Sequence, residues 1–483
     1  MHPLDHLTTF GKPKAPALTV KDDTLTYAEL DAMVGRLAAW LLDQGFAKGD
    51  RVATWEPKTL TTCLMPLAAA RAGLVHVPVN PALKAAQMQG IVEDCEATMV
   101  SPRGAPDGWA GRWLNVDPAA LEVDPLPPSN HDPKTLVALL YTSGSTGKPK
   151  GVMLSHANLA YGADAVADYT NITPETRNLA VMPLAFDYGQ NQLLATWRGG
   201  GQVIAFDYLL PNDVKKSVAR HKITYLAGIP PLWHQLVRLD WSGGEGASLA
   251  TLTNTGGAMT EALLGKLRGA FGDLDIHLMY GLTEAFRAAS LDPAHADTHP
   301  TSVGKAIPHS ELMVVREDGR ACDPGEEGEL VQAGPLVSQG YWNMPEKTAA
   351  RFRPAPAHSD YGGTAVWSGD RFVRDEEGLL HFRARADAMI KVSGNRISPD
   401  EITRVAEQID EVHEAAVTTE PDEALGAAIV LHLAGKGDDA AILRHFRLNA
   451  PSWFMPQRIM WHESLPRTVT GKTDRNKLAE MAT

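Results

Sequence analysis

The sequence has few cysteines, a shortage of positive charge and no long hydrophobic run. Its three cysteines, Cys63, Cys95 and Cys322, have no short spacing between them, which argues against a disulfide framework and against a thiolate metal site. Such cysteine usage is typical of a reducing environment, so we expect a cytoplasmic protein. The formal net charge is -13. Because nucleic-acid binding requires an excess of Lys and Arg, we expect no nucleic-acid partner.

The hydrophobic segments do not favour a membrane location. The most apolar run, residues 64–79, is interrupted by Arg71. The first six residues contain no basic segment followed by an apolar stretch. We therefore expect neither a membrane span nor an export signal.

Length and periodicity predict an α/β fold with more than one folding unit. A chain of 483 residues exceeds what one hydrophobic core usually serves. In residues 27–43 the apolar positions, among them Leu30, Val34 and Leu37, fall on one helical face, and residues 51–55 form a short strand-like run. This alternation predicts helices packed on β-sheets. A polar stretch at 383–387 then precedes a new strand-like run, and the remaining residues suffice for a small second domain.

A loop rich in glycine and hydroxyl residues follows the apolar run 137–141, as expected for a buried strand that ends at a ligand. The glycines free backbone N–H groups, the hydroxyls donate hydrogen bonds, and Lys148 and Lys150 are positively charged, so the loop predicts phosphate binding. It is not the Walker loop, because Thr142 and Pro149 occupy positions where that signature has Gly and Ser or Thr. The predicted phosphate-binding residues are Thr142, Ser143, Gly144, Ser145, Thr146, Gly147 and Lys148.

The loop sequence Tyr-Thr-Ser-Gly-Ser-Thr-Gly-Lys-Pro-Lys-Gly at 141–151 resembles the signature loop of the adenylate-forming (AMP-binding) superfamily. That superfamily includes acyl-CoA synthetases, the adenylation domains of peptide synthetases, and luciferase. Further segments resemble its motifs in the family's order, namely 26–30, 72–81, 254–258, 280–284, 368–370, 391–402 and 466–475. The resemblance covers essentially the whole chain. It implies a large N-terminal domain of several subdomains and a small, mobile α+β C-terminal domain.

The resemblance also implies residue roles at the nucleotide. Tyr280 stacks on adenine, Thr283 contacts the α-phosphate and Glu284 holds Mg²⁺, which is physically sensible because a carboxylate beside a triphosphate is repelled unless a divalent cation lies between them. The wall beside them contains Gly256, Gly257 and Ala258. Asp370 accepts the ribose hydroxyls, and Arg385 reaches the ribose and phosphate.

The C-terminal motifs imply a moving domain. By resemblance, residues 1–384 bind the nucleotide and the acid, residues 385–387 form the hinge with Asp387 at the family's hinge position, and residues 388–483 form the cap domain. Lys391 and Gly394 lie on the face that serves thioester formation. Lys472 is the catalytic lysine, whose ammonium neutralises charge in the transition state of adenylate formation.

The acid pocket departs from the pattern of many CoA ligases. Those enzymes have a histidine in the motif that corresponds to the residues after Met182-Pro183-Leu184 of this chain. This chain has Phe186-Asp187 instead, which resembles peptide-synthetase domains whose aspartate pairs with a substrate amine. A carboxylate in an apolar pocket needs a partner, so Asp187 is a candidate counter-ion for an ammonium group. Alternatively, Asp187 caps a helix that begins near Tyr188. The other predicted pocket residues are Asn191 and Met279.

These patterns predict an ATP- and Mg²⁺-dependent, AMP-forming ligase. It activates a carboxylic acid, such as the small amino acid proline, and transfers the acyl group to CoA or to the phosphopantetheine of a separate carrier protein. Two alternatives remain, a medium- or long-chain acyl-CoA synthetase and a non-catalytic nucleotide sensor. The presence of Lys472, Glu284 and Asp370 together argues against the sensor, because a binding module has no use for the charge-neutralising lysine.

Overall fold

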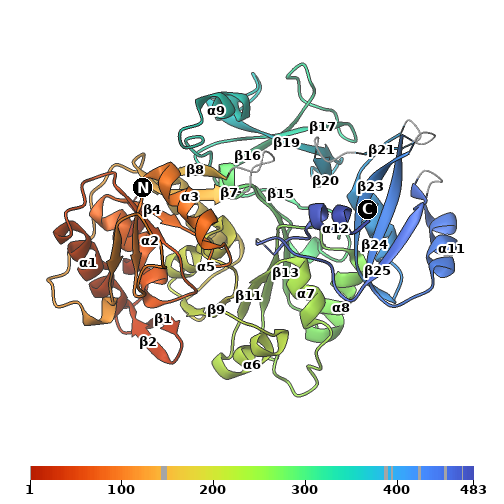
Figure 1. Cartoon of the computed structure of the whole chain (residues 1–483). Helices are drawn as coiled ribbons and strands as arrows, with labels where there is room; N and C mark the ends of the chain where they lie inside the picture. Colours follow the sequence, from red (N-terminus) through yellow and green to blue (C-terminus); the bar gives the residue numbers. More distant parts are fainter. Residues whose placement is uncertain are drawn as a thin grey trace.

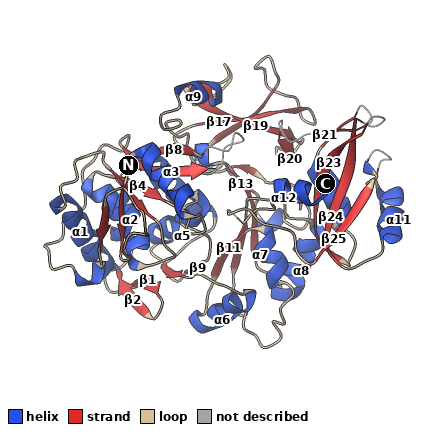
Figure 2. Cartoon of the chain, in the orientation of Figure 1, coloured by secondary structure: helices blue, strands red, loops and turns tan. Residues whose placement is uncertain are grey.

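The computed structural model describes residues 2–142, 149–385, 390–392, 395–422, 426–450, 454–469 and 471–482. Within these ranges, no helix is both long and apolar enough to cross a membrane. Figure 1 shows the elements before residue 385 gathered around three sheets, with the C-terminal elements at one side, and Figure 2 shows helices covering the sheets. This mixed arrangement confirms the predicted α/β fold with a small C-terminal α+β unit.

The first sheet has six strands in the order β6-β5-β3-β4-β7-β8, all parallel except for the antiparallel pair β7 and β8. Its strands are β3 (Arg51–Thr54), β4 (Val75–Pro78), β5 (Thr98–Ser101), β6 (Trp113–Asn115), β7 (Leu136–Thr142) and β8 (Lys150–Ser155). Its helices are α1 (Tyr27–Asp43), α2 (Leu60–Ala72) and α3 (Ala85–Cys95). Helix α1 begins at a capping box between Thr26 and Glu29 and buries the predicted face with Leu30, Val34 and Leu37.

The second sheet has nine strands in the order β15-β14-β13-β12-β11-β9-β10-β1-β2. The strands from β13 to β1 in this order are parallel. Its strands are β1 (Pro16–Val20), β2 (Asp23–Thr26), β9 (Arg177–Ala180), β10 (Gln202–Ala205), β11 (Tyr225–Gly228), β12 (Thr251–Asn254), β13 (Asp275–Tyr280), β14 (Ala289–Ser290) and β15 (Lys305–Ala306). Its helices are α4 (His156–Tyr169), α5 (Asp187–Arg198), α6 (Pro211–His221), α7 (Pro230–Leu236) and α8 (Glu261–Phe271). In open α/β sheets, ligand-binding loops usually follow the carboxyl ends of such parallel strands.

The third sheet is antiparallel and has the order β16-β17-β19-β18, with β20 paired to β19. Its strands are β16 (Glu311–Val315), β17 (Glu327–Ala333), β18 (Phe352–Pro354), β19 (Thr364–Arg374) and β20 (Leu380–Arg385), and helix α9 (Pro345–Arg351) precedes β18. Short 3₁₀-helices are η1 (Leu4–Thr9), η2 (Pro118–Ala120), η3 (Thr283–Ala285) and η4 (Pro293–His295). The long strand β19 carries Asp370 toward the end of the second sheet.

The C-terminal elements have a hydrophobic core of their own, formed by residues that include Val392, Ile402, Leu431 and Phe446. The strands are β21 (Ile390–Val392), β22 (Asn395–Ile397), β23 (Val412–Asp422), β24 (Gly426–Gly435) and β25 (Arg458–His462). The helices are α10 (Pro399–Ala406), α11 (Asp439–Asn449) and α12 (Arg475–Ala482). We refer to these elements as the C-terminal domain, and to those before residue 385 as the N-terminal domain.

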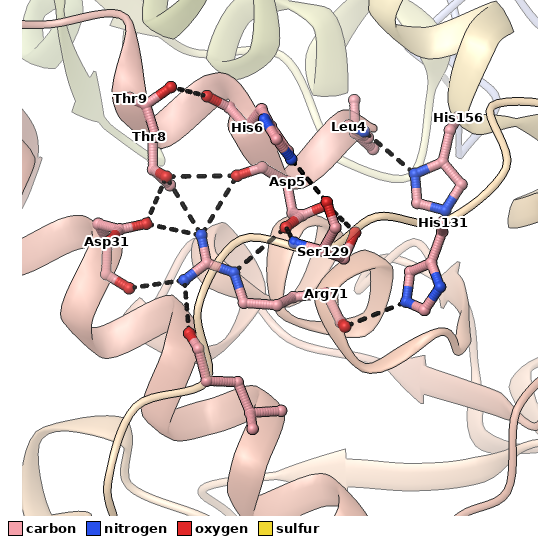
Figure 3. A network of polar contacts seen from close by, with 11 residues as sticks. Leu4, Asp5, His6, Thr8, Thr9, Asp31, Arg71, Ser129, His131 and His156 are labelled. Carbon is pink, nitrogen blue, oxygen red and sulfur yellow. Dashed lines mark hydrogen bonds and ion pairs between the residues drawn. The ribbon is translucent and has the colours of Figure 1, made fainter. Parts of the chain in front are cut away.

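The arginine that interrupts the apolar run forms a buried polar network (Figure 3). The side chain of Arg71, 1% exposed, forms an ion pair with Asp5, which is fully buried, and another with Asp31. Asp5 also accepts hydrogen bonds from the backbone and hydroxyl of Ser129. Because each buried charge has several partners, Arg71 ties η1 to α1 and α2.

Candidate active site

The predicted nucleoside residues meet where the second and third sheets adjoin. The hydroxyl of Tyr280, at the end of β13, donates a hydrogen bond to the carboxylate of Asp370 on β19. The Tyr280 ring packs edge-to-face against Phe372, with 4.9 Å between the ring centroids. Burial raises the pKa of Tyr280 well above its usual value, so the phenol remains neutral. The register of β19 and β20 places the backbone of Arg385 opposite Asp370.

The predicted magnesium ligand is held beside the strand that follows the phosphate loop. Glu284 Oε1 accepts a hydrogen bond from the Tyr341 hydroxyl at 2.6 Å, and its backbone carbonyl accepts one from the N–H of Ser338. Lys150 Nζ lies 5.2 Å from the centroid of the Tyr341 ring. A carboxylate beside the predicted phosphate loop is a ligand that Mg²⁺ prefers, so Glu284 fits the expected metal. The sequence did not predict a role for Tyr341, because its hydrogen-bond partner Glu284 lies 57 residues away in the sequence.

The phosphate loop joins β7 to β8, and the register pairs Thr142 with Lys150 at its base. The remaining predicted phosphate residues lie outside the described residues, namely Ser143, Gly144, Ser145, Thr146, Gly147 and Lys148. Asp387 and Gly394 also lie outside them, whereas Lys391 belongs to β21.

The predicted catalytic lysine lies over the glycine motif that follows β12. The backbone of Thr468 donates to the carbonyl of Lys472 at 2.8 Å and accepts from the N–H of Gly471 at 2.9 Å. This turn brings Lys472 Cε to 4.0 Å from the position that a Cβ on Gly256 would occupy. The φ angle of Gly256 is +77°, a backbone conformation that favours glycine. The neighbouring Gly257 and Ala258 complete the motif between β12 and α8.

Asp187 already has a cationic partner within the protein. Its Oδ2 lies 2.8 Å from Arg287 Nη1, and its Oδ1 accepts a hydrogen bond from Thr283 Oγ1 at 3.3 Å. The side chains of Arg287 and Asp187 are 4% and 15% exposed, so the ion pair is largely buried. The ion pair contradicts the expectation that Asp187 has no cationic partner within the protein, whereas its predicted role as the counter-ion of a substrate amine stays a prediction. The partner lies 100 residues away in sequence, which concealed it.

The alternative interpretation of Asp187 as a helix cap is wrong. Helix α5 begins at Asp187 itself, and the residue in the cap position is Phe186, which makes no side-chain capping bond. The carboxylate points instead to Arg287 and Thr283. Its placement in the first turn still suits the positive end of the helix dipole.

A small cavity of about 10 Å³ lies between α4, α5, β11 and β13. Its polar lining includes Tyr188, Asn191 and Arg287, and Met279 is part of its apolar lining. Of the predicted pocket residues, Asn191 and Met279 therefore line the cavity, whereas Phe186 and Asp187 do not. Asn191 Oδ1 and Arg287 Nη2 are buried without a hydrogen-bond partner among the described residues. Such groups cost free energy unless a ligand or water satisfies them.

Comparisons with known proteins show similar sequences along most of the chain. A family model described as AMP-binding enzyme matches residues 8–342. A feruloyl-CoA synthase from an Amycolatopsis species is 32% identical over 479 residues, which cover 95% of this chain and 94% of that protein. An L-proline–[L-prolyl-carrier protein] ligase from Pseudomonas fluorescens is 28% identical over 502 residues, which cover 97% and 96% of the two chains.

Solved structures show the same architecture along the whole chain. ATP-bound MatB from Rhodopseudomonas palustris matches with a TM-score of 0.89 and 27% sequence identity. The match covers 100% of this chain and 99% of that chain. It therefore includes both the N-terminal and the C-terminal domain.

Proposed function

Because the chain belongs to the AMP-binding enzyme family and is an AMP-forming acid–thiol ligase, we propose that it activates a compact carboxylic acid whose tail carries a hydrogen-bond acceptor. The acid carboxylate attacks the α-phosphorus of ATP, forming the acyl-adenylate and releasing pyrophosphate. A thiol, of CoA or of a carrier protein, then attacks the acyl carbon and releases AMP. Relatives named for each kind of acceptor, an indoleacetate–CoA ligase and the prolyl-carrier ligase, support both possibilities.

In this proposal the nucleotide lies between the two domains. Tyr280 and Asp370, joined by their hydrogen bond, bind adenine and ribose, and Arg385 lies beside the ribose. The loop from Thr142 and the motif at Gly256, Gly257 and Ala258 surround the phosphates. Thr283 contacts the α-phosphate. Residues 385–387 are the proposed hinge.

Charge at the reacting phosphates is neutralised from two sides. Lys472, over Gly256, places an ammonium group where negative charge increases as the carboxylate attacks. Glu284 would hold Mg²⁺ together with phosphate oxygens, and the ion would supply further neutralisation of charge. The Tyr341 hydroxyl keeps the Glu284 carboxylate in place.

The observation that carries the proposed acid class is the buried Arg287 Nη2 beside the small cavity. The guanidinium packs over the Tyr188 and Phe286 rings, 4.9 and 5.6 Å from their centroids, and its Nη1 is occupied by Asp187. The remaining N–H groups suit a carbonyl or carboxylate oxygen on the acid's tail. At about 10 Å³ the cavity has room for a single water-sized group, so it would receive one oxygen of the acid's tail and does not measure the length of that tail.

A small amino acid such as proline is the second candidate. The similarity to the prolyl-carrier ligase favours it. Asn191 Oδ1, which is buried without a described partner, is an acceptor for an amine N–H. In this version the amine would bind Asn191, and the charge of Asp187 would remain engaged with Arg287.

Acid-dependent exchange of pyrophosphate into ATP tests the proposal with acids matched in size. Levulinate against pentanoate, and succinate against butyrate, compare tails with and without an acceptor, and proline against cyclopentanecarboxylate tests the amine. A hydrogen bond to a charged group contributes about 1.5–3 kcal/mol, so we expect kcat/KM to be about 10- to 100-fold higher for acids with an acceptor. Equal rates within the first two pairs, or a preference for octanoate, would refute the acceptor class while leaving the ligase activity intact.

A further inference from the structure

A side chain of the N-terminal domain holds the turn that carries the catalytic lysine. Asn80 follows β4 in a segment that resembles a packing motif, and it is 6% exposed. Its Nδ2 donates a hydrogen bond of 2.7 Å to the carbonyl of Val469, 389 residues away in the C-terminal domain. The two domains are therefore joined at a point only three residues from Lys472.

Contacts within the N-terminal domain orient the Asn80 amide. Its Oδ1 accepts a hydrogen bond of 2.9 Å from the backbone N–H of Ala82, and its backbone carbonyl accepts one of 3.0 Å from the N–H of Leu83. Since the oxygen faces Ala82, the NH₂ group faces Val469. An amide provides both an acceptor and a donor, which a carboxylate of the same shape does not.

Backbone hydrogen bonds connect the residues next to Val469 with the catalytic lysine. Thr468 bonds to Lys472 and to Gly471 through its backbone, as described above, so a shift of the Val469 carbonyl moves Lys472 with it. Gly471 also lies against the N-terminal domain, because a Cβ at this position would be 3.2 Å from Ile229 Cδ1. Asn80 and Ile229 therefore contact the turn from two sides, and Lys472 Cε lies over Gly256.

We propose that Asn80 is a positioning residue for adenylate formation, which holds the Val469 carbonyl so that the Lys472 ammonium lies over the phosphate site. This inference rests on the proposed role of Lys472 in the first half-reaction. In the proposed function the lysine serves the first half-reaction, so we expect Asn80 to act selectively on that step. Alignment within a fraction of an ångström matters for such a charge, because misplacement removes stabilisation that exists only in the transition state.

The test uses Asn80→Asp in the full-length enzyme, which keeps the size of the side chain and the acceptor for Ala82 but removes the donor to Val469. We expect kcat for pyrophosphate exchange to fall about 3- to 10-fold, as for the loss of one hydrogen bond, with little change in the KM for ATP. Thioester formation from a supplied acyl-adenylate should keep its wild-type rate. Asn212→Asp, which adds the same charge at an exposed site, should leave both rates unchanged.

A second measurement does not depend on the acid or on activity. Hydrogen–deuterium exchange of the free enzyme should show faster exchange in residues 466–474 of Asn80→Asp, and unchanged exchange in the β23–β24 pair. Equal loss in both half-reactions, or unchanged protection of 466–474, would overturn the role of Asn80. If the proposed function itself is wrong, wild-type activity fails with every acid while the change in protection persists.

Discussion

Replacing Asp187 by Asn should destabilise the N-terminal domain whatever acid the enzyme uses. The substitution keeps the shape of the side chain but removes the charge opposite Arg287, which is 4% exposed and cannot turn to solvent without repacking. Removing one partner of a buried ion pair costs about 3–5 kcal/mol, because the remaining charge stays buried. Asp187 retains 15% exposure, so we expect the lower end, about 3 kcal/mol.

Such a loss is a large fraction of the stability of a typical domain, which is about 5–15 kcal/mol. The measurement is urea unfolding followed by tryptophan fluorescence. Trp197 and Trp233 are fully buried in the N-terminal domain and report on the sheet that carries the ion pair. The midpoint of this transition should fall without a change in its slope.

The control is the double variant Asp187→Asn/Arg287→Met, which removes both charges. Methionine retains apolar contact with the rings of Tyr188 and Phe286 on which the guanidinium packs. The double variant should regain more than half of the stability lost by Asp187→Asn, because replacement of a whole buried ion pair is often neutral. The cycle with Arg287→Met alone gives the coupling energy.

Pyrophosphate exchange with proline and cyclopentanecarboxylate completes this test. If the ion pair is structural, Asp187→Asn affects both acids to a similar extent. An unchanged urea midpoint together with a loss confined to proline would refute the reasoning, because it would show that the carboxylate pairs with the substrate amine and that Arg287 does not need it.

Three further outcomes are expected. Lys472→Ala should reduce the rate of adenylate formation about 100-fold, which is the effect of losing one charge-stabilising group. Thioester formation from a supplied acyl-adenylate should keep its rate. Equal losses of rate in the two half-reactions, measured by rapid quench, would contradict this prediction. Burial raises the pKa of Glu407, which contacts Thr260 of the N-terminal domain, from 4.5 to about 7. Between these two pH values the folded state keeps a proton that the unfolded state loses. The free energy of unfolding should therefore fall by at most about 3 kcal/mol between pH 4.5 and pH 7 and should not change further above pH 7. Glu407→Gln should flatten this profile in thermal melts across pH; an unchanged profile would assign the titration to other groups. Arg71→Met should cost about 3–5 kcal/mol by leaving the buried Asp5 carboxylate without its counter-ion, and an unchanged urea midpoint would contradict the role of the network in Figure 3.

Local patterns in the sequence predicted much of the fold. The helix expected at 27–43 is α1 with the same bounds, because a capping box and a continuous apolar face are local properties. The apolar run 137–141 lies within β7, which leads into the phosphate loop. The segment 72–81, by contrast, is identified by its resemblance to a family motif, and that resemblance does not predict the contact of its Asn80 with Val469.

The sequence by itself determined the family, the α/β class and the order of the motifs, because glycines, hydroxyls and charged residues at fixed short spacing define a loop's chemistry wherever it lies. Only the tertiary structure decided which side chains meet. Parallel strands joined by crossovers bring residues such as Asp187 and Arg287 together from distant segments, and domain docking brings Asn80 to Val469. The periodicity of the sequence does not predict such pairs, because each residue of a pair is an ordinary polar residue among its neighbours in the sequence. The sequence therefore shows that Asp187 carries a charge, whereas only the folded structure shows that the charge pairs with Arg287.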